Sequence, residues 1–115
     1  MSTVYAIVWE FRPRAGREGD FERAYGPEGD WALLFRRGEG YLGTELLRES
    51  GDPAGPRYLT IDRWASREAH EAFLRAHRAE YEALDRACEG VTDRESSLGC
   101  FESVEPAGRR GPGCG

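Results

Sequence analysis

Residues 3–11, TVYAIVWEF, carry apolar side chains on both faces of a predicted strand, which constrains the fold more than any other segment. The segment is rich in aromatic and β-branched residues, as is typical of strands. Because successive side chains alternate between faces, one face carries Tyr5, Ile7, Trp9 and Phe11. The other face carries Val4, Ala6, Val8 and Glu10. We therefore expect this strand to be covered on both sides.

The rest of the chain alternates between helix and strand patterns. A broken helix is predicted at 17–25 and 31–37, interrupted by the sequence GPEG. Further strands are predicted at 40–49, 57–64 and 96–105. Ser66 is a good N-cap for one long helix that runs to Gly90, a natural stop.

This order predicts an α+β fold of the ferredoxin-like split β-α-β type, a four-stranded antiparallel sheet with helices on one face. Residues 1–105 are expected to form this single domain, and residues 106–115 a Gly/Pro-rich flexible tail. Helices cover only one face of such a sheet. A second copy of the chain packed sheet to sheet would cover the other, so we expect a homodimer.

Composition excludes several classes of partner. The formal net charge is -5, and no basic run exceeds a pair, which argues against nucleic acid. No apolar run approaches the roughly 20 residues of a membrane helix, and no signal peptide is visible. The three cysteines form no CxxC pair and indicate free thiols. We therefore expect a cytoplasmic protein that binds neither nucleic acid nor membrane.

The two histidines, His70 and His77, lie in the sequence HEAFLRAH on the apolar side of the predicted long helix. A zinc-protease helix needs its histidines four residues apart, but position 74 is Leu, so no metal site is predicted. His77 beside Tyr81 could be a catalytic base and its hydrogen-bonding partner in an apolar cavity. Alternatively, His77 is a core histidine. His70 is nearer the helix start and would lie at a pocket rim.

Polar residues inside the strands need partners, and two interpretations remain open. Thr60, Asp62 and Glu45 could orient a substrate, or Asp62 or Glu45 could pair with an arginine at a subunit interface. The aromatic residues are either core or the walls of a pocket for a flat aromatic ligand. The candidate substrate-binding residues are Trp9, Trp31, Phe35, Trp64, Phe73 and His70.

The sequences YAIVWEFRPRAGREGDFERAY, GYLGTELL and YLTIDRWASREAHEAF resemble the antibiotic biosynthesis monooxygenase family over about residues 3–105. The resemblance implies a dimeric α/β barrel with a pocket between each sheet and its helices. It also implies that some members oxidise polyketide aromatics with O₂ and without a cofactor.

One branch of this family degrades haem with an Asn on the first strand and a Trp and a His on the last helix. The corresponding positions here are Trp9, Phe73 and Ala83, so the haem triad is not matched. Haem thus remains the least favoured ligand, and no cofactor is expected.

Two hypotheses of equal weight follow. The first is a small cofactor-independent monooxygenase that acts on an aromatic or polyketide-like molecule, with His77 and Tyr81 as catalytic residues. The second is a dimeric barrel that binds a ligand or serves a stress-related role without chemistry of its own.

Overall fold

The structure is a computed structural model that describes residues 3–51 and 55–104. The strands are β1 (Tyr5–Pro13), β2 (Tyr41–Arg48), β3 (Tyr58–Trp64) and β4 (Thr92–Glu102). The helices are α1 (Glu18–Tyr25), α2 (Asp30–Phe35), α3 (Arg67–Ala76) and α4 (Arg78–Ala87). The predicted tail, 106–115, lies outside the described residues.

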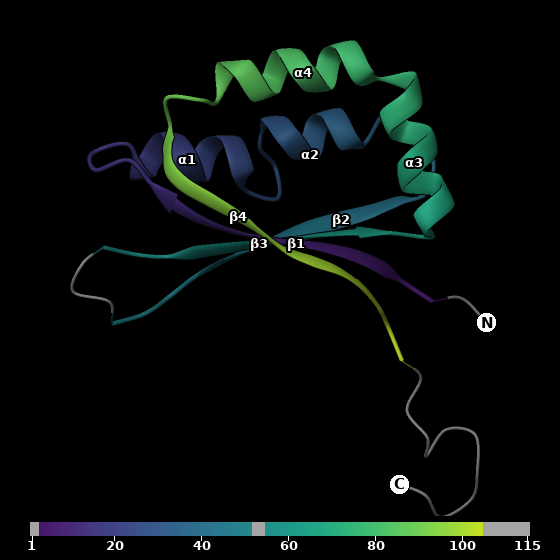
Figure 1. The fold of residues 1–115 in the computed structure, drawn as a ribbon, viewed down its shortest axis with the longest axis horizontal. Helices are drawn as coiled ribbons and strands as arrows, with labels where there is room; N and C mark the ends of the chain where they lie inside the picture. The colour runs from purple at the N-terminus through teal and green to yellow at the C-terminus, as the bar shows by residue number, and fades with distance from the viewer. Residues whose placement is uncertain (1–2, 52–54, 105–115) are drawn as a thin grey trace, which may run out of the picture.

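The strands form one antiparallel sheet in the order β2-β3-β1-β4. The helices α1, α2 and α4 lie over one face of this sheet, and α3 stands at its end (Figure 1). This arrangement confirms the predicted α+β, ferredoxin-like fold with a four-stranded antiparallel sheet and helices on one face.

The core lies between the helices and the face of β1 that carries Ile7 and Phe11, both buried. Phe11 pairs across the sheet with Tyr58, and the Phe21 and Tyr25 rings of α1 stack at 4.5 Å above them. The largest fully buried side chains are Trp64, Tyr58 and Phe21. A core built mainly of rings packs as tilted and edge-to-face pairs, which fixes the helices against the sheet.

The opposite face of the sheet is not covered by the helices (Figure 1). The strand registers bring together apolar residues on this face, namely Ala6, Val8, Leu47, Leu59, Ile61 and Phe101. Leu47 and Phe101 are 41% and 52% exposed. The apolar residues expected on both faces of β1 are therefore present, and the dimer that would cover them stays a prediction.

A glycine produces the predicted interruption between α1 and α2. A Cβ on Gly29 would lie 2.3 Å from the Arg23 carbonyl oxygen and 2.7 Å from that of Ala24. Because glycine has no side chain, the chain can pass this close to the end of α1 and start α2 against it.

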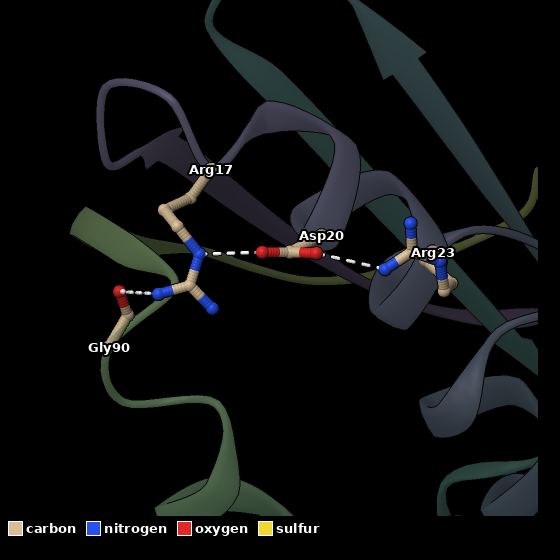
Figure 2. Close-up of polar contacts among 4 residues, drawn as sticks. All are labelled: Arg17, Asp20, Arg23 and Gly90. Carbon is tan, nitrogen blue, oxygen red and sulfur yellow. Dashed lines mark hydrogen bonds and ion pairs between the residues drawn. The ribbon is translucent and has the colours of Figure 1, made fainter.

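Polar contacts hold the start of α1 to the connection between α4 and β4 (Figure 2). Arg17 Nε donates to Asp20 Oδ2 at 2.6 Å, and Arg23 Nη1 donates to Asp20 Oδ1 at 2.9 Å. Arg17 Nη1 also reaches the Gly90 carbonyl oxygen at 3.5 Å. The two arginines lower the pKa of Asp20, so its carboxylate stays ionised as the centre of this contact.

The single long helix predicted after Ser66 is wrong, because the structure has two helices that meet at His77. Ser66 is the cap, and its Oγ accepts the Ala69 N–H at 3.0 Å. His77, at φ -126° and ψ 31°, lies outside the helical region and separates α3 from α4, which run in very different directions (Figure 1). No proline or glycine stands there, so packing makes the break: α3 contacts β3, while α4 contacts α2.

Two further expectations can be compared with the described residues. Cys88 and Cys100 are free thiols, as predicted, and Cys114 lies outside the described residues. In the described part of the chain, no helix is long and apolar enough to cross a membrane.

Candidate functional site

A cavity of about 80 Å³ lies between the sheet and the helices α1, α2 and α4. Aromatic rings form most of its wall, contributed by Trp9, Phe11, Tyr25, Trp31, Phe35 and Tyr81. Polar side chains from β2, β3, β4 and α4 complete the lining, namely Thr44, Thr60, Asp62, Glu95 and Asp85. An apolar pocket with a few converging polar groups is the usual form of a small-molecule site.

The rings of the wall are held by one another. Trp31 of α2 meets Tyr81 of α4 edge to face at 4.9 Å between ring centroids. On the other side, Tyr25 lies 6.1 Å from Trp31 and 4.8 Å from Phe11. This arrangement makes an apolar surface that suits a flat ligand.

Asp62 is the least exposed of the three carboxylates that line the cavity. Its Oδ1 accepts a hydrogen bond from Thr44 Oγ1 at 2.7 Å. The Tyr41 hydroxyl lies 2.6 Å from the same Thr44 oxygen. Because Thr44 donates its only proton to the carboxylate, Tyr41 donates to Thr44, and the two hydroxyls form a directed chain that ends at Asp62.

The carboxylate of Asp62 has no ion-pair partner among the described residues. Burial raises the pKa of Asp62 to about 6, and the hydrogen bond from Thr44 opposes that rise. A carboxyl group with a pKa near neutral is ionised at pH 7 and is basic enough to accept a proton from a weakly acidic ligand.

Tyr81 faces the same cavity and keeps its proton. Burial raises the pKa of its phenol, and the nearby carboxylates Asp85, Asp62 and Glu95 raise it further. At neutral pH this hydroxyl is therefore a hydrogen-bond donor and acceptor and not a charged group.

The structure gathers only some of the predicted site residues in this cavity. Trp9, Trp31, Phe35 and Tyr81 line it. Trp64 and Phe73 lie behind Phe35, at 5.9 Å and 5.4 Å between ring centroids, and belong to the core. They support the wall without lining the cavity.

The two histidines lie elsewhere. His70 packs edge to face on Trp64 at 5.3 Å, and burial lowers its pKa. His77 borders a separate, open depression together with Phe73. Its buried Nδ1 has no hydrogen-bond partner among the described residues, since Glu80 Oε2 is 4.0 Å away. The break at His77 is why it does not share the Tyr81 cavity.

Asp62 was not among the candidate catalytic residues, although strand alternation places it on the same face as Trp64 and Thr60. Of the two pairs suggested by the sequence, Glu45 does pair with Arg63 at 3.2 Å, on the face away from the helices. Asp62 pairs with Thr44 and not with an arginine. The combination of Thr60 and Asp62 inside a strand was the available signal.

Within residues 3–51 and 55–104, no group of three or more histidine, cysteine or acidic side chains is placed to hold a metal ion.

Comparisons with known proteins point to one family. A family model described as antibiotic biosynthesis monooxygenase matches residues 4–84. No curated protein sequence matches the chain significantly.

Solved structures share the fold at low sequence identity. SnoaB, a cofactor-independent oxygenase from Streptomyces nogalater, is 20% identical with a TM-score of 0.62, over 91% of this chain and 96% of that one. A protein from Bordetella bronchiseptica, described as an antibiotic biosynthesis monooxygenase, is 20% identical with a TM-score of 0.63, over 91% and 100%. A Pseudomonas aeruginosa protein is 17% identical with a TM-score of 0.59, over 91% and 96%.

Proposed function

Because the chain belongs to the antibiotic biosynthesis monooxygenase family, we propose that it oxidises an aromatic or polyketide-like small molecule with O₂ and without a metal or organic cofactor. The observation that carries the proposal is the Asp62 carboxylate, with a pKa of about 6, inside a cavity walled by aromatic rings. The likeness to SnoaB, itself a cofactor-independent oxygenase, supports the same chemistry.

The reaction starts when Asp62 accepts a proton from a CH₂ group activated by neighbouring aryl and carbonyl groups. The carbanion gives its electrons to O₂, and a carbon–oxygen bond forms. Asp62 returns the proton to the resulting peroxide, which then loses water. The CH₂ becomes C=O, one oxygen atom enters the product and the other leaves as water. The substrate supplies all four electrons, so no other reductant is consumed.

The residues around Asp62 have separate tasks in this proposal. Thr44 keeps the carboxylate oriented toward the cavity and lowers its pKa. Tyr81 binds the substrate oxygen next to the acidic CH₂. The rings of Trp9 and Trp31 hold the flat substrate in place and keep water away from the carbanion.

The size of the cavity sets how a substrate binds. It is smaller than the roughly 150 Å³ that accommodates benzene in an engineered protein cavity. We therefore expect the reacting ring to enter as Tyr81 and Asp85 shift outward, with the rest of the molecule at the opening beside Asp85 and Glu95.

His77, the proton acceptor suggested by the sequence, stays a prediction, and one experiment separates it from Asp62. O₂ uptake and product formation with an anthrone probe are measured for the wild type, Asp62→Asn and His77→Ala. General-base catalysis contributes about 10²–10⁴-fold, so Asp62→Asn should lose at least about 100-fold in kcat/KM. His77→Ala should keep its activity.

Circular dichroism shows whether both variants fold. Full activity in Asp62→Asn would contradict the proposed role of Asp62, and loss of activity in folded His77→Ala would return that role to His77. If the probe quenches the tryptophan fluorescence of the wild type but no O₂ is taken up, the protein binds the ligand without catalysing its oxidation. A red-shifted Soret band on titration with haemin would instead favour haem.

We also propose that the protein is a cytoplasmic homodimer, joined through the sheet face that carries Ile61 and Phe101. The apolar residues of that face support this assembly, and a standard interface buries roughly 800 Å² per partner. The free thiols of Cys88 and Cys100 are suited to a reducing compartment. Light scattering after size exclusion should give twice the chain mass, and Ile61→Glu should give a monomer. A monomeric wild type would contradict this assembly.

A further inference from the structure

Building on the proposed function, we infer that the cavity selects an aromatic substrate that carries an ammonium group, with the ring beside Asp62 and the ammonium between Asp85 and Glu95. Aromatic acids of the same size are excluded by the same groups.

The charge of the lining is of one sign. Among the residues that the structure describes, the lining has three carboxylates, Asp62, Asp85 and Glu95, and no arginine or histidine. All three line the same small space as Tyr81, and beyond the effect of burial their charges raise the pKa of its phenol. A ligand that enters this space meets a negative potential that protein cations do not offset there.

The two outer carboxylates stand on different elements, Asp85 on α4 and Glu95 on β4. Both are exposed, and neither forms an ion pair with a described residue. This differs from Asp20 and Glu80, which contact arginines at 2.9 Å and 3.6 Å. The carboxylates of Asp85 and Glu95 are therefore free to bind a cation supplied by a ligand.

The aromatic wall favours the same ligand class. The faces of Tyr, Trp and Phe rings are electronegative and attract organic cations as well as other rings. A phenolic or related ring inside the cavity contacts Trp9 and Trp31, and a short alkyl chain brings an ammonium group to the opening. A carboxylate at the same position would be repelled by Asp85 and Glu95 at once.

Three probes of nearly equal size test the proposal: tyramine, which is cationic, 4-ethylphenol, which is neutral, and 3-(4-hydroxyphenyl)propionate, which is anionic. Binding is measured by quenching of tryptophan fluorescence, since Trp9 and Trp31 line the cavity. Tyramine should bind at least about tenfold tighter than 4-ethylphenol, and the anion should bind most weakly. The preference should fall as salt is added, because exposed charges are screened.

The double variant Asp85→Asn, Glu95→Gln should bind tyramine and 4-ethylphenol about equally. Glu82→Gln is the matched control, because Glu82 is an exposed carboxylate on α4 that does not line the cavity. It should keep the wild-type preference. Equal binding of the three probes by the wild type, a preference that survives the double variant, or no binding by any probe at millimolar concentration would each overturn the proposal.

This binding test needs no turnover, so it fails separately from the proposed reaction. Charge selectivity without O₂ uptake would support the ligand class and contradict the oxygenase. O₂ uptake without charge selectivity would support the oxygenase and contradict the ligand class.

Discussion

Two aspartates of this protein meet opposite surroundings. Asp20, on α1, lies between Arg17 and Arg23 with 43% of its side chain exposed (Figure 2). Those arginines lower its pKa. Asp62, on β3, has a hydroxyl as its partner, and burial raises its pKa to about 6.

The difference separates a carboxylate that binds neighbouring arginines from one that accepts a proton in the proposed reaction. Asp20 binds two arginines at the start and end of α1, and one of them, Arg17, also reaches the Gly90 carbonyl oxygen. Asp62 is partly buried without a compensating cation, which costs stability in its ionised form. Strongly perturbed groups of this kind gather at functional sites, where the unfavourable placement provides reactivity.

The largest effect that tests this comparison is the change in the free energy of unfolding caused by Asp62→Asn. Because the folded pKa of Asp62 is above its ordinary value of 3.8, the protonated form is favoured by folding. The contribution of Asp62 to wild-type stability is therefore most favourable below about pH 4 and is lost as the pH rises through about 6. The shift corresponds to about 3 kcal/mol. Asp62→Asn should lack this fall and should be more stable than the wild type at pH 8.

Urea unfolding of both proteins at pH 4 and pH 8 provides the measurement. The two proteins should differ much less at pH 4, where Asp62 is protonated in the folded state and only about half ionised in the unfolded state. An Asp62→Asn variant that is less stable than the wild type at pH 8 would contradict the unfavourable burial of the charge.

A smaller effect concerns the pH dependence of activity. If Asp62 is the base, kcat/KM should rise with pH through an apparent pKa near 6. Thr44→Val removes the hydrogen bond to the carboxylate and should move this midpoint upward by up to about one unit. The measurement is the pH–rate profile of each protein. Thr92→Val, on β4 and outside the cavity, is the matched control and should leave the midpoint in place.

The smallest effect is expected at Asp20. Its lowered pKa means that its contribution to stability is present above about pH 4 and is lost as the pH falls through the folded value. Asp20→Asn should therefore slightly lower the midpoint of thermal unfolding at pH 7 and leave activity unchanged. Added salt should shrink this difference, because the charges are exposed. A difference that does not respond to salt would show that Asp20 acts through packing.

The fold could be predicted because its main signals are local. Alternation in residues 3–11 and 57–64, the interruption at GPEG and the cap at Ser66 depend on neighbours in the sequence, and each is present in the structure. The break at His77 depends on what α3 and α4 each pack against. No proline or glycine marks this break, so the sequence alone could not predict it.

The site was harder to predict for the same reason. Trp9, Trp31 and Phe35 were candidates because large aromatic residues are conspicuous, and Tyr81 because it follows His77 by one helical turn. All four line one cavity. His77 was chosen on the assumption of an unbroken helix. The character of Asp62 depends on burial and on Thr44, a residue 18 positions away. The burial of Asp62 and its contact with Thr44 can be predicted only once the register between β2 and β3 is known.

The separation of α3 from α4 has a consequence for how this protein can diversify. No residue of α4, all of which lies in the described part of the chain, is fully buried, whereas α3 is anchored by Phe73. Substitutions at the exposed positions of α4, such as Asp85, thus carry little penalty in folding, yet they alter the opening of the cavity. New ligand preferences can accumulate there while the sheet and its aromatic core are left intact, which makes α4 the natural place to start when redesigning this scaffold for other small molecules.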